Sequence, residues 1–98
     1  MSDSFQLDLS DEAKAELKRL KQRDVKRARK VAGALKKLRE HGPKYPSLNS
    51  HKIESIPGPY GETWESYIEN HTPNAWRVFW CYGPEAGMIH IFAIREHL

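Results

Sequence analysis

The chain has 98 residues, of which 39% are hydrophobic and 30% are charged. These values fit one folded domain spanning residues 1–98 and argue against global disorder. No apolar run approaches the roughly 20 residues that a membrane-spanning helix needs, and the single cysteine, Cys81, excludes an internal disulfide. We therefore expect a cytoplasmic protein that makes no membrane contact.

The first half of the chain predicts one strand and two amphipathic helices. Residues 5–9 alternate apolar and polar side chains, which is the period of a half-buried strand. Ser10 is a good N-cap for a helix from about Asp11 to Gln22, and Asp24 can cap a second helix that runs to about His41, before Gly42-Pro43. A single long helix through Asp24 is the alternative. Apolar residues recur at helical spacing in both segments: Ala13, Leu17 and Leu20, then Val25, Ala28, Val31, Leu35 and Leu38.

The second half of the chain predicts a sheet, entered through a loop over residues 43–50. The predicted strands are His51 to Ile56, Trp64 to Glu69, Ala75 to Tyr82 and Met88 to Ile94. Turns rich in Gly and Pro at this spacing favour antiparallel hairpins. We therefore predict an α+β fold of order β-α-α-β-β-β-β, an antiparallel sheet with the two N-terminal helices packed on one face. The other face should stay open, and its polar side chains are where we expect chemistry.

Charge is distributed unevenly along the chain, although the net charge is only +3. Of the 16 Lys and Arg residues, 12 lie between Lys14 and Arg39, within the predicted helices. A basic surface of this kind suits a polyanion or an acidic protein partner. The alternative is a solvated helix face in which Lys and Arg serve helix propensity.

Three stretches of the sequence resemble the RelE/ParE superfamily of bacterial toxins. They are Phe5 to Ser10, the aromatic-Arg-Val-aromatic run within Ala75 to Trp80, and Ile89 to Leu98. The length and the order of elements add to this resemblance, which is strongest to RelE/YoeB-like mRNA interferases of type II toxin–antitoxin systems. It implies a ribosome-dependent endoribonuclease that inhibits translation, with a cognate antitoxin, the ribosome and mRNA as partners. It leaves open a ParE-like inhibitor of DNA gyrase, or a non-catalytic member that only binds its antitoxin.

Metal-independent RNA cleavage uses the ribose 2′-hydroxyl as nucleophile and needs a base, a cation and an acid from the protein. Arg77 is the candidate cation, because its guanidinium fork matches phosphate oxygens and its position matches the family's central-strand arginine. The alternative for Arg77 is an ion pair with Glu65 or Glu69. His97 is the candidate acid or base, since imidazole titrates near neutrality, unless the terminus is frayed. Extended spacing would place His97 on one side of the strand with Arg95, a candidate second phosphate contact.

Four further residues are candidate RNA contacts: His51, Lys52, Glu54 and Tyr67. In toxins that the chain resembles, a Lys or Glu near the first three positions contributes base or electrostatic function. Tyr67, or alternatively Tyr60, is the candidate ring for base stacking in this chain. The alternative is a solvated strand edge. The histidines and Cys81 show no metal-ligand spacing, so we predict no metal site and no cofactor. Cys81 is expected to be a buried small hydrophobe and His90 a hydrogen-bonded residue of the sheet.

The sequence departs from the resembled toxins in two places. Many of them carry a tyrosine in the stretch that reads Arg95 to Leu98 here. Such toxins also often carry Arg or Lys where this chain has Glu65 and Glu69. Two carboxylates on one strand face would repel an RNA backbone, which favours the two alternatives without nuclease activity.

Overall fold

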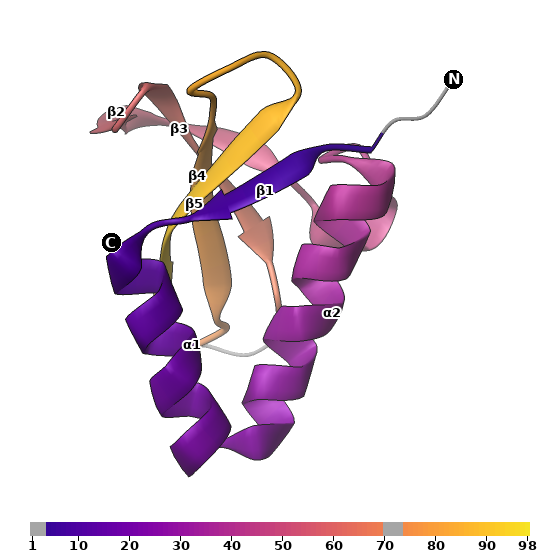
Figure 1. The fold of residues 1–98 in the computed structure, drawn as a ribbon, viewed down its shortest axis with the longest axis vertical. Helices are drawn as coiled ribbons and strands as arrows, with labels where there is room; N and C mark the ends of the chain where they lie inside the picture. The colour runs from indigo at the N-terminus through magenta and orange to yellow at the C-terminus, as the bar shows by residue number, and fades with distance from the viewer. Residues whose placement is uncertain (1–3, 70–73) are drawn as a thin grey trace.

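The structure, a computed structural model, describes residues 4–69 and 74–98. Its elements in chain order are β1 (Gln6–Leu9), α1 (Asp11–Arg23), α2 (Val25–His41), the 3₁₀ helix η1 (Pro46–Leu48), β2 (His51–Gly58), β3 (Gly61–Tyr67), β4 (Arg77–Tyr82) and β5 (Met88–Arg95). This order confirms the predicted succession of one strand, two helices and four strands. Figure 1 shows the two helices meeting at one end and diverging toward the sheet.

The five strands form one sheet in the order β1-β5-β4-β3-β2. Strands β2 to β5 are antiparallel, as the turn spacing predicted. Strand β1 instead lies parallel to β5, with Leu7 opposite Ile89, so the sheet as a whole is mixed. No hairpin turn links β1 to β5, because a parallel pair needs a long crossover connection. Local turn signals therefore carry no information about this pairing.

Side-chain caps separate the two helices. The Ser10 hydroxyl accepts a hydrogen bond from the Ala13 N–H at 3.0 Å, and the Asp24 carboxylate accepts one from the Arg27 N–H at 3.1 Å. The backbone of Asp24 is not helical, with φ −148° and ψ 75°, which rules out the alternative of a single long helix. Gly42 ends α2 with φ 77°, in the left-handed region that favours glycine.

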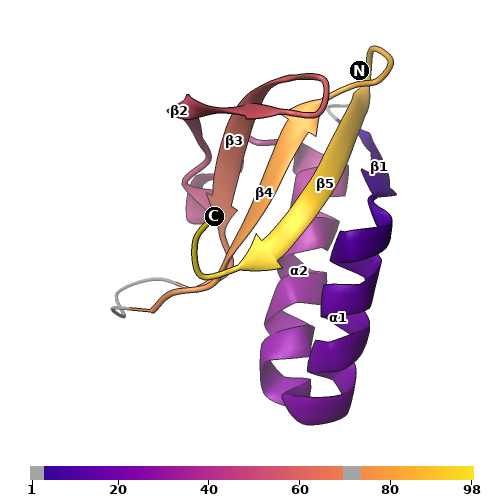
Figure 2. The ribbon, with the colours of Figure 1, turned by 90° about the vertical axis from the view of Figure 1, so that its left-hand side faces the viewer.

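The main core lies between the helices and the inner face of the sheet (Figure 2). Fully buried side chains from the sheet meet buried residues of both helices there: Val78, Trp80, Ile89, Ile91 and Ile94 from the sheet, and Ala13, Val31 and Leu38 from the helices. The Trp80 indole N–H donates to the Ser66 hydroxyl at 2.8 Å, so the one polar atom of this large ring is satisfied.

The outer face of the sheet is not fully open, which corrects the sequence prediction. Strand β2 and the turn into β3 cross this face over β4 (Figure 2). Gly58 allows the close approach, because a Cβ there would lie 3.2 Å from the Cβ of Cys81. The ring of Tyr60 lies 5.1 Å from that of His90. Only the part of the outer face near the start of β4 remains accessible for chemistry.

Within the described ranges, no helix is both long enough and apolar enough to cross a membrane.

Gly33 lies in the interior of α2, and nothing in the structure comes within 4 Å of where its Cβ would be. A glycine in a helix interior is destabilising relative to alanine. We therefore expect Gly33→Ala to raise the free energy of unfolding by about 0.5–1 kcal/mol, measured by urea denaturation followed by circular dichroism. Gly42→Ala is the matched comparison and should lower stability, because its φ is positive. A loss of stability in Gly33→Ala would contradict the prediction.

Candidate functional site

Four side chains on the outer face of β2, β3 and β4 come together, and we call them the outer-face cluster: His51, Glu65, Tyr67 and Arg77. Strand pairing explains the grouping. His51 is opposite Glu65 across β2 and β3, and Tyr67 is opposite Arg77 across β3 and β4. Directly opposite residues of an antiparallel pair point to the same face. Register therefore assembles the cluster from three strands.

Glu65 is the centre of the outer-face cluster. Its side chain is only 7% exposed, and its carboxylate lies 2.8 Å from His51 Nε2 and 3.6 Å from a terminal nitrogen of Arg77. A buried carboxylate is costly unless it is paired. The other ring nitrogen of His51, Nδ1, lies 2.9 Å from the carbonyl oxygen of Asn49. Both partners of the ring are acceptors, so the form of His51 that donates to both is the doubly protonated imidazolium.

Arg77 is held in place without using all of its donors. Its guanidinium carbon lies 5.2 Å from the centre of the Tyr67 ring, a cation–π contact, in addition to the ion pair with Glu65. Its Nε is buried and has no hydrogen-bond partner among the described residues. A guanidinium carries five N–H donors, so Arg77 retains donors for an anionic ligand. The sequence alternative of an ion pair with Glu65 is thus observed, and it orients the side chain.

Tyr67 connects the members of the cluster, because its ring also meets the His51 ring edge-on at 5.8 Å. Its side chain is half-buried, so one part of the ring is accessible to solvent. The cluster therefore combines a fixed cation, a carboxylate–histidine pair and an accessible aromatic ring. This set can bind a phosphate, move a proton and stack on a base.

Arg95 lies on β5 opposite Arg77, but its donors point to α1. Its guanidinium binds the carboxylates of Glu12 and Glu16, the latter at 3.0 Å. Burial opposes the charge of Arg95, but these two carboxylates outweigh that effect and raise the pKa of the guanidinium. The Arg95 guanidinium therefore stabilises the contact between α1 and the end of β5. Pairing each arginine with its own carboxylates also offsets the repulsion between two like charges on adjacent strands.

His97 is exposed and makes no hydrogen bond or ion pair with the described residues. Strand β5 ends at Arg95, so the extended spacing predicted to align His97 with Arg95 does not continue. After β5 the chain turns back toward the outer face of the sheet in the view of Figure 2. The structure leaves His97 free to take part in proton transfer, and its role remains a prediction.

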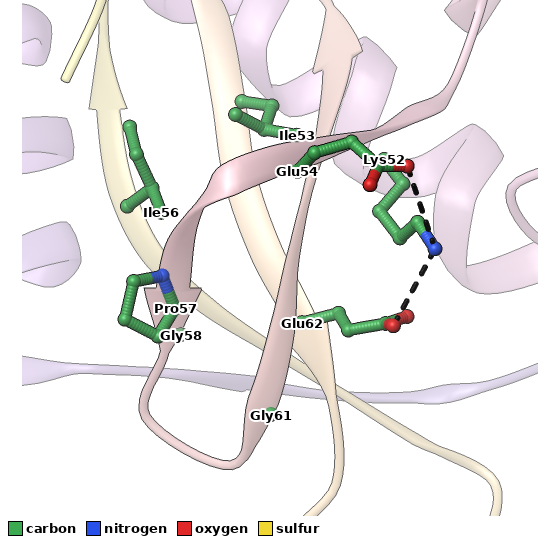
Figure 3. Close-up of a pocket in the computed structure, with 8 residues that line it drawn as sticks. All are labelled: Lys52, Ile53, Glu54, Ile56, Pro57, Gly58, Gly61 and Glu62. Carbon is green, nitrogen blue, oxygen red and sulfur yellow. Dashed lines mark hydrogen bonds and ion pairs between the residues drawn. The ribbon is translucent and has the colours of Figure 1, made fainter.

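Lys52 and Glu54 lie outside the outer-face cluster. They line a pocket of about 350 Å³ along β2 and the start of β3, where the Lys52 ammonium lies 3.7 Å from Glu54 and 3.4 Å from Glu62 (Figure 3). Lys52 points away from His51 because neighbouring residues of a strand face opposite sides. These contacts fit the sequence alternative of a solvated strand edge, although they do not test RNA binding.

Glu69 does not share a face with Glu65, because β3 ends at Tyr67 and the alternation stops there. Its carboxylate accepts hydrogen bonds from Arg27 at 3.4 Å, from Lys30 at 3.3 Å and from the Trp76 N–H at 3.2 Å. Burial opposes its ionisation, but these donors hold the pKa of Glu69 below its ordinary value of 4.5. Both carboxylates are thus paired with cations and do not lie on one strand face, and their effect on RNA binding stays a prediction.

The described residues contain no group of three or more His, Cys, Asp or Glu side chains placed to hold a metal ion. Cys81 is buried, and burial raises the pKa of its thiol, as expected of a small hydrophobe. His90 is also buried, with Nδ1 lying 2.7 Å from the carboxylate of Asp8. The pairing of Glu65 with His51 was not predicted from the sequence. Strand alternation places Glu65 and Tyr67 on one face, but only the register brings His51 to them.

Comparison with known proteins gives a clear answer for the fold. No protein-family model matches the sequence, and a search of curated proteins found no relative. Solved structures do match over nearly the whole chain. The YoeB dimer from Staphylococcus aureus has a TM-score of 0.71 at 17% identity, covering 97% of this chain and 99% of that one. A YoeB/ParE toxin from Agrobacterium tumefaciens has a TM-score of 0.67 at 11% identity, covering 95% and 99%.

The chain has the fold of the YoeB/ParE toxins. A YoeB–YefM toxin–antitoxin complex from Staphylococcus aureus also matches, with a TM-score of 0.69 at 19% identity over 96% of this chain and 98% of that one. This agreement confirms the fold expected from the resemblance to the RelE/ParE superfamily.

The position of Glu69 predicts an acid-sensitive part of the stability. Since its pKa is lower in the folded state, ionised Glu69 stabilises the fold above pH 4.5, and this contribution is lost as the pH falls through the folded pKa. We expect Glu69→Gln to lower the free energy of unfolding by about 1 kcal/mol at pH 7. The difference from the unchanged protein should shrink below pH 4.5, measured by urea denaturation at a series of pH values. Glu54→Gln is the control, because Glu54 is exposed. A difference that is independent of pH would count against the prediction.

Proposed function

We propose that this protein is the toxin of a type II toxin–antitoxin pair and that it inhibits translation by cutting mRNA on the ribosome. The likeness of its fold to YoeB structures, one of them in complex with YefM, supports a cognate antitoxin as partner. Bacterial mRNA and ribosomes are cytoplasmic, so the proposal places the protein there. The observation that carries it is the outer-face cluster, in which a buried carboxylate orients a histidine and an arginine.

The proposed roles follow from the geometry of the cluster. Arg77 stabilises the charge that develops on the phosphate, because Glu65 fixes its guanidinium and its side chain is 30% exposed, so terminal N–H groups can reach a ligand. Tyr67 stacks on a base next to the cut, with the ring held by His51 and Arg77. Arg95 is left out of the proposed site because its donors bind α1. Lys52 and Glu54 are left out because they pair along the other side of β2.

The reaction needs two proton transfers. A base takes the proton of the 2′-hydroxyl, the 2′-oxygen bonds to phosphorus, and the bond from phosphorus to the 5′-oxygen breaks. An acid gives a proton to that leaving oxygen, which leaves a 2′,3′-cyclic phosphate and a 5′-hydroxyl end. In the proposal, protonated His51 is the acid: it gives its Nδ1 proton to the leaving oxygen and so loses its contact with the Asn49 carbonyl, while Glu65 stays at Nε2 as the counter-charge. The exposed His97 supplies the base.

The basic helices support binding to ribosomal RNA. Several of their cations make no ion pair with the described residues: Lys14, Lys18, Arg19, Lys21, Arg23, Lys26, Arg29, Lys36 and Arg39. Among the helix cations, Arg27 and Lys30 do make ion pairs, with Asp24 and Glu69. Unpaired surface cations favour contact with a polyanion and make that contact dependent on salt. An acidic antitoxin segment would also fit this surface.

A gyrase-directed toxin is the second candidate, because one matching structure is described as a YoeB/ParE toxin. In that case the outer-face cluster would contribute only to stability. Growth arrest with continuing protein synthesis and an activated DNA-damage response would support this candidate and contradict the nuclease.

Inducing the protein in bacteria should arrest growth and stop the incorporation of labelled methionine. We expect Arg77→Gln and His51→Gln each to lower mRNA cleavage by about 10²–10³-fold, measured by primer extension, because each removes a group that acts in the transition state. His97→Ala should have an effect of similar size. Lys44→Gln is the matched control, since it removes an exposed cation from the turn after α2, outside both the helices and the outer-face cluster.

The fold of each variant has to be checked, because removing Arg77 leaves the buried Glu65 with only His51 as partner. Arg77→Lys keeps the positive charge but loses the planar fork, so it should fold normally and still lose most activity. Full toxicity of both Arg77 variants, with normal melting curves, would refute the proposed role of the cluster.

A further inference from the structure

A second pocket adjoins the outer-face cluster, between α2 and the end of β3. It has a volume of about 240 Å³, and its lining includes Lys30, Gly33 and Lys37 of α2, Ser47 of η1, and Tyr67. Tyr67 belongs to both sites, because the same side chain contacts His51 and Arg77 on the outer face. Tyr67 therefore borders both the pocket and the cation Arg77.

The α2 side of this pocket is positively charged. Lys30 and Lys37 are seven residues apart, which places them on one face of the helix at a separation of about 10 Å along its axis. The Lys37 ammonium donates to the Ser47 hydroxyl at 3.3 Å and lies 5.4 Å from the centre of the Tyr45 ring. No carboxylate pairs with it among the described residues. Lys30 is partly neutralised by Glu69 at 3.3 Å.

Gly33 lies between the two lysines, and it leaves the wall of the pocket open. A Cβ at Gly33 would meet nothing within 4 Å, so no close packing inside the protein requires a glycine here. Glycine in a helix interior lowers the stability of the helix, and no packing contact at this position compensates for that loss. Because glycine has no side chain, the wall of the pocket has space for a bound group at Gly33, between the helix positions of Lys30 and Lys37.

We propose that this pocket binds a backbone phosphate of single-stranded RNA, at a nucleotide flanking the one held by Arg77. The inference rests on the proposed nuclease function and adds a second binding position to it. Lys37 contacts the phosphate, Lys30 adds positive charge, and Gly33 leaves room for the phosphate and its ribose. An RNA chain fits better than an acidic peptide, because the accessible ring of Tyr67 borders both Arg77 and the pocket, and successive phosphates and bases match that alternation of cation and ring.

The test measures binding apart from cleavage. A fluorescein-labelled oligoribonucleotide with every 2′-hydroxyl replaced by 2′-O-methyl lacks the nucleophile and cannot be cut. Its dissociation constant is measured by fluorescence anisotropy at several salt concentrations. We expect Lys37→Gln to weaken binding on the order of five-fold and to lower the salt dependence by about 0.7, the loss of one phosphate contact. Lys44→Gln is the matched control: it removes the same charge from an exposed residue in the turn after α2, which lines a different pocket.

A second pair of variants tests the space at Gly33. Gly33→Leu should weaken binding of the same oligonucleotide several-fold while it stabilises the helix, so the loss cannot be attributed to unfolding. Ala32→Leu is its control, because Ala32 is exposed on the same helix and lies outside the pocket. The phosphate site is supported if both pocket variants weaken binding and both controls stay within two-fold of the unchanged protein.

Three results would overturn the inference: no binding of the oligonucleotide by the unchanged protein, equal losses in Lys37→Gln and Lys44→Gln, or unaltered binding in Gly33→Leu. Polyglutamate of matched length serves as competitor. If it displaces the oligonucleotide equally well, the assignment to RNA is wrong. These outcomes are distinct from failure of the proposed nuclease, which would appear as absent mRNA cleavage while the oligonucleotide still binds at the pocket.

Discussion

The structure depends on the burial of strand β5, which pairs with neighbours on both edges and packs under α1. Its inward residues Ile89, Ile91 and Ile94 are inaccessible to solvent. The parallel contact with β1 brings the start of the chain to its final strand. The carboxylate of Glu16 on α1 accepts the Ile94 N–H at 2.9 Å and binds Arg95, so the helix is fastened to the same strand. Strand β4 pairs antiparallel with β5, and β3 pairs antiparallel with β4. This pairing fixes the positions of the cluster residues on β3 and β4.

The two faces of the sheet consequently differ in what covers them. Helices cover the inner face, where large apolar side chains are buried (Figure 2). On the outer face, the turn between β2 and β3 covers the region of Cys81 and His90, so reactive groups there are shielded. The candidate site lies at the other end of that face. There Glu65 is buried between His51 and Arg77, and one carboxylate sets the orientation of both.

Charge pairing explains why this chain tolerates carboxylates where related folds were expected to carry cations. Glu65 and Glu69 are both buried against positive groups, but on different sides of the sheet. Glu69 fastens the end of β3 to α2, whereas Glu65 belongs to the candidate site. Most cations of the helices make no ion pair with the described residues, so the positive potential of that surface is not cancelled by carboxylates there. Glu65 orients the candidate site, and Glu69 stabilises the contact between β3 and α2.

The sequence by itself determined the elements and their order, because helical periodicity, Ser10 and Asp24 as caps, and strand alternation are local properties. It also singled out Arg77, as a cation within an apolar strand. Tertiary structure alone decided the parallel pairing of β1, the attachment of Arg95 to α1, and the register that places His51 opposite Glu65 and Tyr67 opposite Arg77. These contacts join residues far apart in the chain, and they are selected by the packing of the whole sheet, so no local pattern specifies them.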